Sequence, residues 1–158
     1  MKHLPITVRG HAALQEELER RLKIDRPQIA DQIAEARGME SNPAESPELQ
    51  SALEAQEANE ARIARLSDML ARAEVIDTSK LSGTTVKFGA VVTLVDEDTG
   101  QKRALQIVGE PEADIGRGMI SCASPVARSL LGQKKGSSVE VLTPKGPKMY
   151  EIKQLQWR

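Results

Sequence analysis

The fold is decided by the stretch Arg37-Gly38-Met39-Glu40-Ser41-Asn42-Pro43-Ala44-Glu45-Ser46-Pro47-Glu48-Leu49, which lies between two long segments rich in Leu, Ile, Glu and Arg. A cluster of Gly, Ser, Asn and Pro between two helical patterns predicts the tip of an antiparallel helical hairpin. Ser46 is a natural N-cap, Pro47 suits the first helical position, and Glu48 favours the positive helix end. The second helix is therefore predicted to begin at Pro47 or Glu48.

The predicted tip is acidic. Residues 38–61 contain no Lys or Arg but six acids, namely Glu40, Glu45, Glu48, Glu54, Glu57 and Glu60. Glu45 and Glu48 are three residues apart, so their carboxylates could lie on one face and hold Mg²⁺ while another molecule completes its shell. In the alternative interpretation, Glu48 caps its helix and Glu45 is solvated.

Apolar residues recur at helical spacing on both sides of the tip. In the first segment they are Leu14, Leu18, Leu22, Ile29, Ile33 and Ala36. Pro27 interrupts this stripe and predicts a kink, or alternatively a break into two helices. The return stripe is Leu49, Leu53, Gln56, Glu60, Ile63, Leu66, Leu70 and Ala73. Because its middle is polar, we expect the distal half of the hairpin to exchange its amide hydrogens fastest.

The periodicity changes beyond the helix end predicted at residues 75–77. Residues 78–85 predict a linker, and β-branched, alternating runs predict strands at 86–88, 90–95, 103–108, 120–123, 138–143 and 149–155. A short capped helix is predicted from Ser124 to Gly132. The expected class is α+β, with a helical hairpin over residues 1–77, a linker over 78–85 and a small domain over 86–158.

The charge is unevenly distributed. Residues 1–77 have a net charge of −5 and the remainder +4, which suggests a different partner for each half. The three aromatic residues make stacking on nucleic-acid bases an unlikely binding mode. The single cysteine, Cys122, excludes an internal disulfide and fits a reducing compartment. With no apolar run near 18 residues and no signal-peptide core, we expect a cytoplasmic protein without a membrane span.

Several motifs resemble those of the GreA/GreB transcript-cleavage factors, in family order and over nearly the whole chain. They are Leu4-Pro5-Ile6-Thr7-Val8-Arg9-Gly10, Arg26-Pro27, Ile33-Ala34-Glu35-Ala36-Arg37, Phe88-Gly89-Ala90, Ile107-Val108-Gly109, Ile120-Ser121, Ser124-Pro125-Val126-Ala127-Arg128 and Leu131-Gly132. The resemblance implies a coiled-coil finger followed by an FKBP-like domain. It also implies that this domain docks at the rim of the secondary channel of bacterial RNA polymerase, while the finger enters the channel.

In the family, an Asp and a following Glu at the tip help to bind a catalytic Mg²⁺, and the polymerase itself hydrolyses the backtracked RNA. Glu45 matches that Glu, whereas Asn42 stands where the Asp is expected, after allowing one extra residue before the second helix. A neutral amide is a weaker ligand for a hard cation than a carboxylate. Glu40 or Glu48 could supply the missing carboxylate.

The resemblance assigns further candidate residues. Arg37 is the candidate RNA contact, and Ala123 stands where the family often has Asp or Asn. The candidate docking residues are Ile120, Ser121, Ala123, Ser124, Pro125 and Arg128.

We therefore expect a monomeric regulator of transcription elongation, not itself an enzyme, which stimulates cleavage weakly or not at all. It would hold no stable cofactor and would meet nucleic acid indirectly, within the elongation complex. Two alternatives stay open: a functional cleavage cofactor, and a structural coiled-coil module that binds an unrelated basic partner.

Overall fold

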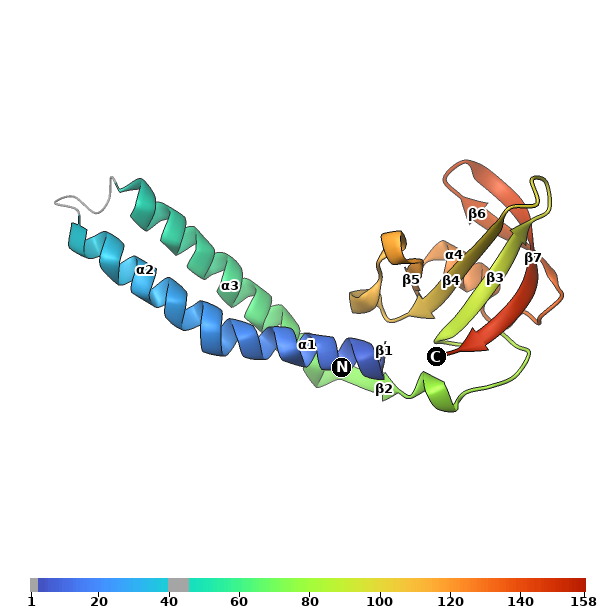
Figure 1. The fold of residues 1–158 in the computed structure, drawn as a ribbon, viewed down its shortest axis with the longest axis horizontal. Helices are drawn as coiled ribbons and strands as arrows, with labels where there is room; N and C mark the ends of the chain where they lie inside the picture. Colours follow the sequence, from blue (N-terminus) through green and yellow to red (C-terminus); the bar gives the residue numbers. More distant parts are fainter. Residues whose placement is uncertain (1–2, 40–45) are drawn as a thin grey trace. The chain divides into compact units, whose positions relative to one another are not determined.

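The computed structural model describes residues 3–39 and 46–158 and divides into two compact units (Figure 1). Residues 11–72 form the first unit, here called the finger. Residues up to 10 together with 73–158 form the second, here called the sheet domain. The boundaries predicted from the sequence, a finger over residues 1–77, a linker over 78–85 and a small domain over 86–158, stay a prediction.

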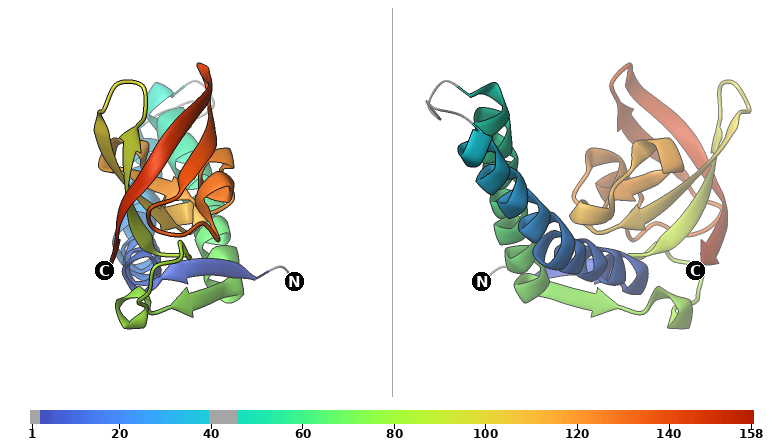
Figure 2. Two further views of the ribbon diagram at one scale, coloured as in Figure 1. Left: turned by 90° about the vertical axis from the view of Figure 1, so that its right-hand side faces the viewer. Right: turned by 60° about the vertical axis from the view of Figure 1, so that its left-hand side comes forward.

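The outgoing arm of the hairpin consists of α1 (Val8–Arg20), the π-turn η1 (Arg21–Asp25) and α2 (Arg26–Met39). The helix is not broken, because the residues flanking the π-turn keep helical backbone angles. The Arg26 N–H bonds the carbonyl of Arg21, five residues back, immediately before Pro27, which has no N–H of its own. The irregularity predicted at Pro27 is therefore present as a π-turn. Figure 2 shows the change of direction between α1 and α2.

The π-turn changes which residues face inward. Leu22, predicted on the apolar stripe, is 36% exposed, whereas Arg21 and Asp25 are only partly exposed. An i to i+5 turn holds one extra residue, so the 3.6-residue period is interrupted there. Leu14 and Ile33, on either side of the turn, are buried as predicted.

The return helix is α3 (Pro47–Arg72), and its predicted stripe is wrong in the middle. Leu53, Gln56 and Glu60 are exposed, and the buried positions are instead Ala52 and Asn59. The predicted and the observed buried positions both fit a helical period. The prediction favoured Leu53 as the buried residue because it is larger than the neighbouring Ala52. The prediction of rapid exchange rested partly on this stripe, and it stays untested.

The distal half of the finger has its own apolar cluster. Its buried members are Ile33, Ala36, Leu49 and Ala52, and Ile29 packs against them. The cluster joins α2 to α3 near the tip. The predicted antiparallel hairpin is thus held by apolar contacts in its distal half.

The two ends of the hairpin are paired as parallel strands. Strand β1 (Leu4–Thr7) lies beside β2 (Ala73–Ile76), and Ile6 is fully buried. The sequence-based end of the second helix at residues 75–77 is therefore wrong, because the β-branched residues there pair with β1. Thr7 is the N-cap of α1, since its hydroxyl accepts a hydrogen bond from the Gly10 N–H at 3.1 Å.

Five strands form the sheet: β3 (Ala90–Asp96), β4 (Lys102–Val108), β5 (Met119–Ser121), β6 (Ser138–Thr143) and β7 (Gly146–Trp157). Their spatial order is β5-β4-β3-β7-β6, with β4 and β5 parallel and the other neighbours antiparallel. The predicted strand at 86–88 is absent from this sheet. Val86 instead exchanges backbone hydrogen bonds with Gly132 and Gln133.

Short helical turns connect these strands: η3 (Thr78–Lys80), η4 (Glu110–Glu112), η5 (Ile115–Arg117) and the helix α4 (Pro125–Leu130). Alternate residues of the strands share one apolar core with Ala127 and Leu130 of α4. The α+β class expected from the sequence is confirmed.

Candidate functional site

Ser46 is the N-cap of α3 and lies directly before its first residue, Pro47. It is almost fully buried, and its hydroxyl accepts a hydrogen bond from the Leu49 N–H at 3.1 Å. The same hydroxyl donates to the Glu48 carboxylate at 3.3 Å. The N-cap and Pro47 at the first helical position are therefore where the sequence predicted them. Glu48 is exposed and lies in the first turn, where the helix dipole favours its charge.

The other three tip candidates, Glu40, Asn42 and Glu45, lie outside the described residues, so the proposed Mg²⁺ contact of Glu45 is not tested. Within residues 3–39 and 46–158, no three His, Cys, Asp or Glu side chains are grouped so that they could hold a metal ion. A Mg²⁺ ion prefers several oxygen ligands. Glu48 alone would therefore need ligands from another part of the chain or from a partner.

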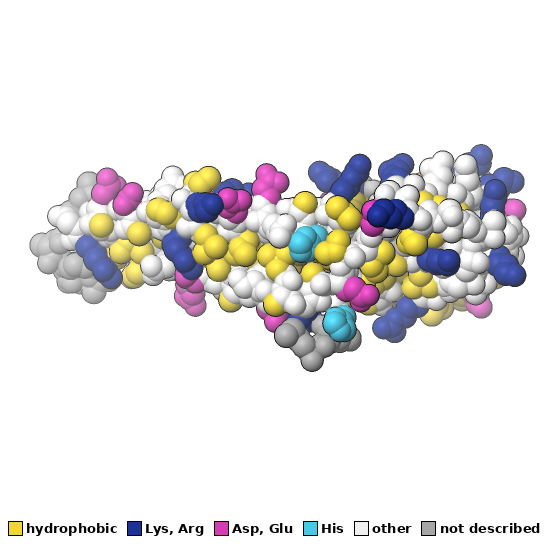
Figure 3. Space-filling view, turned by 90° about the horizontal axis from the view of Figure 1, so that it is seen from below, with side chains coloured by type: hydrophobic (Ala, Val, Ile, Leu, Met, Phe, Trp, Pro, Cys, Tyr) yellow, Lys and Arg dark blue, Asp and Glu magenta, His cyan; other side chains and the backbone are white. Residues whose placement is uncertain are grey.

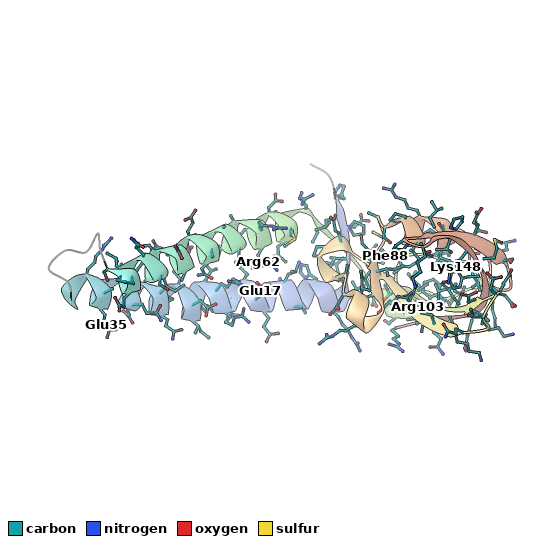
Figure 4. The ribbon with its side chains drawn as sticks, turned by 90° about the horizontal axis from the view of Figure 1, so that it is seen from above. Glu17, Glu35, Arg62, Phe88, Arg103 and Lys148 are labelled. Atoms are coloured by element: carbon teal, nitrogen blue, oxygen red, sulfur yellow. The ribbon has the colours of Figure 1, made fainter. Side chains whose placement is uncertain are left out.

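Arg37 lies on the last turn of α2 and is exposed. It forms no ion pair with another described side chain, and its assignment as an RNA contact stays a prediction. An open groove between α2 and α3 is lined by the buried Ala36 and Ala52 and by the exposed Glu35 and Glu48. Figure 4 labels Glu35 on this distal part of the finger.

The six candidate docking residues follow one another from β5 into α4. Ser121 and Ser124 shape the connection: the Ser121 hydroxyl accepts from the Ala123 N–H at 3.1 Å, and the Ser124 hydroxyl caps α4 at the Ala127 N–H at 3.2 Å. Ala123 is exposed at the tip of this turn.

Pro125 and Arg128 are also exposed, whereas Ile120 belongs to the core. The structure thus brings Ala123, Pro125 and Arg128 into one surface segment, and Ile120 could contribute only by anchoring it. Figure 3 shows Lys and Arg side chains gathered over the sheet domain, in line with the positive charge of residues 78–158.

Cys122, in the same segment, is half-buried. Burial raises the pKa of its thiol, and the carboxylates of Glu110 and Glu112 act in the same direction. A thiol with a raised pKa is mostly protonated near neutral pH, so it is a poor nucleophile. The Cys122 side chain packs against the apolar core of the sheet domain, which indicates a structural role.

Glu112 is a structural residue that the sequence-based interpretation missed. Its carboxylate accepts from the Thr7 N–H at 3.0 Å, from the Thr7 hydroxyl and from the Gly109 N–H at 2.8 Å. A Cβ on Gly10 would lie 2.2 Å from the Glu112 Cδ, so glycine is required for this approach. The spacing of Gly109 and Glu112, three residues apart around a proline, was a capping signal that could have identified it.

A charged layer across the middle of the finger was also missed. The Glu17 carboxylate accepts two hydrogen bonds from Arg62, both 2.8 Å, and one from Arg21 at 2.7 Å (Figure 4 labels Glu17 and Arg62). Chiefly through the hydrogen bonds from Arg62, the pKa of Glu17 falls from 4.5 to about 2. Arg21 also donates to the buried Asn59 at 3.0 Å.

A neighbouring ion pair joins the same two arms. Arg26 donates to the Glu60 carboxylate through Nε at 3.0 Å and through Nη2 at 2.7 Å. Both side chains are about half exposed, so solvent screens this pair and it contributes little to the stability of the finger.

One sequence signal could have identified Asn59. It lies four residues before the apolar Ile63 on α3, so both residues lie on the same face of the helix.

These features define a class of protein in which a helical-hairpin finger is followed by a small α+β domain, with candidate residues at the tip of the one and on the surface of the other. The family description "Transcription elongation factor, N-terminal" matches residues 4–75, and "Transcription elongation factor, GreA/GreB, C-term" matches residues 81–156. The chain belongs to the GreA/GreB family of transcription elongation factors.

Two relatives named transcription elongation factor GreA agree with this assignment. A protein named transcription elongation factor GreA from Nitrobacter winogradskyi is 56% identical over 158 residues, covering 100% of this chain and 99% of that protein. The one from Bradyrhizobium diazoefficiens is also 56% identical, with 100% of both chains covered. A solved structure titled transcription factor Gfh1 is 28% identical and covers 99% of both chains, with a TM-score of 0.47. Among the described residues, no helix has the length and apolar character needed to span a membrane.

Proposed function

We propose that this elongation factor binds RNA polymerase at the secondary channel and regulates elongation while stimulating transcript cleavage weakly or not at all. The observation that carries the proposal is the presence of Asn42 at the position where the resemblance calls for an Asp, with Glu45 retained. The protein would act as a cytoplasmic monomer and, at most, as a cofactor for the polymerase's own chemistry.

The physical reason lies in the demands of Mg²⁺. This ion loses its water reluctantly and depends on charged oxygens to hold it, so the loss of one carboxylate lowers its occupancy. The ion also activates water and stabilises developing negative charge, so the cleavage rate should fall with occupancy. Pro43 and Pro47 restrict the backbone around the tip, which limits how the remaining carboxylates can compensate.

Two features of the finger support a role that depends on presenting the tip. The cap formed by Ser46 fixes where α3 begins, and the distal apolar cluster joins the two arms just before the tip. Glu48 accepts a hydrogen bond from Ser46, which favours the interpretation that it supports its own helix. It is therefore the weaker candidate for replacing the missing Asp.

The first experiment measures RNA cleavage in stalled elongation complexes. The unmodified protein should stimulate cleavage by the polymerase weakly, and Asn42→Asp should raise the cleavage rate because it restores a carboxylate at the family position. Ser41→Asp is the matched control, since it adds the same charge one residue away, and it should leave the rate unchanged. Robust stimulation of cleavage by the unmodified protein that is abolished by Glu40→Ala would contradict the proposal and show that Glu40 supplies the missing carboxylate.

The second experiment tests the docking surface in the full chain. Ala123→Glu places a charge on the exposed turn beside Pro125 and should weaken binding to polymerase. Ala104→Glu, at an exposed position on β4, is the matched control and should bind normally. Equal binding by both variants would show that the segment from Ile120 to Arg128 is not the docking surface.

A functional cleavage factor is the second candidate. The observation that favours it is the 56% identity to proteins named transcription elongation factor GreA over the whole chain. The cleavage assay on the unmodified protein separates the two candidates. A polymerase pull-down separates both of them from a coiled-coil module with an unrelated partner.

A further inference from the structure

Asn59 occupies an unusual place in the finger. On α3, Ile63 and Leu66 are buried on one side of it, and Leu49 and Ala52 are buried on the other. Asn59 itself is only 4% exposed. A buried amide between apolar positions needs hydrogen-bond partners, because an unpaired one is strongly unfavourable.

Both ends of the Asn59 side chain bond the same residue on the opposite arm. Its Oδ1 accepts from the Arg21 Nη1 at 3.0 Å, and its Nδ2 donates to the Arg21 backbone carbonyl at 3.4 Å. That carbonyl also accepts the Arg26 N–H that closes the π-turn. The amide of Asn59 therefore bonds to the atom that defines the turn.

We infer that Asn59 is a positioning residue that holds the π-turn at Arg21–Asp25 and thereby sets the direction in which α2 leaves α1. An extra residue in a helix can be accommodated at more than one place along it. If the turn shifted, the carbonyl and guanidinium of Arg21 would lose their partner on α3, and the Asn59 amide would be left buried and unpaired. The π-turn at Arg21–Asp25 is therefore favoured over the same turn at neighbouring positions along the helix.

The other contacts in this region are less selective. Ala52 and the half-buried Ala55 present similar small surfaces to α2, so they would tolerate a rotation of that helix. The Arg26–Glu60 pair is exposed and joins two long, flexible side chains. Glu17 holds the Arg21 Nε from the same arm and so orients the guanidinium toward Asn59. These contacts support the bend, and Asn59 adds bonds from the opposite arm to both the side chain and the backbone of Arg21.

The inference about the bend concerns the finger alone and does not depend on any partner. Its consequence for transcription, that the bend directs the tip, rests on the function proposed above. The two are tested by different measurements, so failure of one is distinguishable from failure of the other.

The test measures the bend directly in the full chain. Spin labels are attached at Ala12→Cys on α1 and Gln32→Cys on α2, both exposed positions, with Cys122→Ser to remove the native thiol. Pulsed electron paramagnetic resonance then gives the distribution of distances across the π-turn. Asn59→Asp is the critical variant, because it keeps the shape and an acceptor for Arg21 but replaces the Nδ2 donor with an oxygen.

We expect a narrow distance distribution in the labelled parent and a broader or shifted one in Asn59→Asp. Gln56→Glu, the matched amide-to-acid change at an exposed position of α3, should match the parent. Asn59→Leu, which removes both hydrogen bonds, should also broaden the distribution. A distribution in both Asn59 variants identical to the parent would overturn the inference. A loss of helical circular dichroism in both would equally overturn it, because Asn59 would then support the whole finger rather than its bend.

The polymerase assay follows separately. If the bend directs the tip, Asn59→Asp should reduce the protein's effect on elongation, while Gln56→Glu should not. An unchanged effect together with a broadened distance distribution would leave the positioning role of Asn59 established and would show that the bend does not direct the tip.

Discussion

The sheet domain and the finger are held together in different ways. Among the described residues, twelve buried ones form a single apolar cluster in the sheet domain, drawn from its strands, from α4 and from Val86. The distal apolar cluster of the finger has four described buried members, and the middle of the hairpin is crossed by Glu17, Arg21, Asn59 and Arg62. The sheet domain therefore depends on packed volume, whereas the finger also depends on charge and on paired polar groups. Mutations that reduce core volume should therefore affect the stability of the sheet domain most, whereas changes in pH and ionic strength should affect the stability of the finger most.

The largest effect is expected from a cavity in the sheet domain. Ile107 is fully buried in the core, so Ile107→Ala should lower the free energy of unfolding of this region by about 2–5 kcal/mol. Urea denaturation followed by a probe in the sheet domain measures it. Met149→Ala, at a position that is 40% exposed on β7, should cost less than about 0.5 kcal/mol. Equal costs for the two variants would show that the core does not dominate the stability of this region.

The next effect is expected from pH acting on the finger. Because the pKa of Glu17 falls from 4.5 to about 2 on folding, its contribution is present above pH 4.5 and is lost as the pH falls toward 2. After allowance for solvent screening, Glu17→Gln should cost the finger about 1–2 kcal/mol at pH 7. Hydrogen exchange of residues in α1 and α3 measures it.

The matched control for this change is Glu16→Gln, on the same helix but outside the charged layer. The difference in finger stability between Glu17→Gln and Glu16→Gln should shrink as the pH is lowered toward 2. A pH-independent difference would mean that the ionised Glu17 carboxylate is not what stabilises the layer.

A third test concerns the close approach of Gly10 and Glu112 in the sheet domain. Gly10→Ala should destabilise the protein by about 1 kcal/mol, because the added Cβ collides with a carboxylate that three hydrogen bonds hold in place. In a Glu112→Ala background the same change should instead stabilise, since Ala favours a helix over Gly by about 0.5–1 kcal/mol. A thermal-unfolding double-mutant cycle measures this change of sign. Simple additivity would rule out the predicted collision.

The smallest effect is expected at the exposed pair of the finger. Arg26→Gln removes a bidentate pair whose side chains are 48% and 46% exposed. The free energy of unfolding of the finger should therefore fall by at most about 0.5 kcal/mol, and this loss should vanish in high salt. A cost near that of Glu17→Gln would show that exposure does not separate the two ionic contacts.

Much of the fold could be predicted because local signals agreed with the final structure. Ser46 and Pro47 start α3, Ser124 caps α4, and residues 138–143 form β6, all as their residue types indicated. In each case the deciding interactions lie within a few residues of the signal. A capping hydroxyl or an alternating strand can therefore be identified from a short window.

The errors have two kinds of cause, namely a distant partner and a local irregularity in a helix. The sequence predicts a helix end at Val75 and Ile76, whereas both residues pair with the distant strand Leu4–Thr7. The helical period predicts Leu22 inside, whereas the extra residue of the π-turn leaves it exposed. For the candidate site, the position of Glu48 could be predicted from helix rules, but a metal site at Asn42 and Glu45 depends on groups that another molecule supplies.

The parallel pairing of β1 and β2 determines where the chain can be shortened without removing a strand. Because β1 precedes the finger and β2 follows it, the finger is an insertion between two adjacent strands of the sheet domain. A fragment that begins near residue 80 would lack both strands, and Glu112 would lose the Thr7 groups that it binds. Parallel strands cannot be joined by a tight turn and need a crossover of roughly a dozen residues. A fingerless version of this protein should therefore keep residues 3–10 and 73–158 and replace the hairpin with a linker of that length.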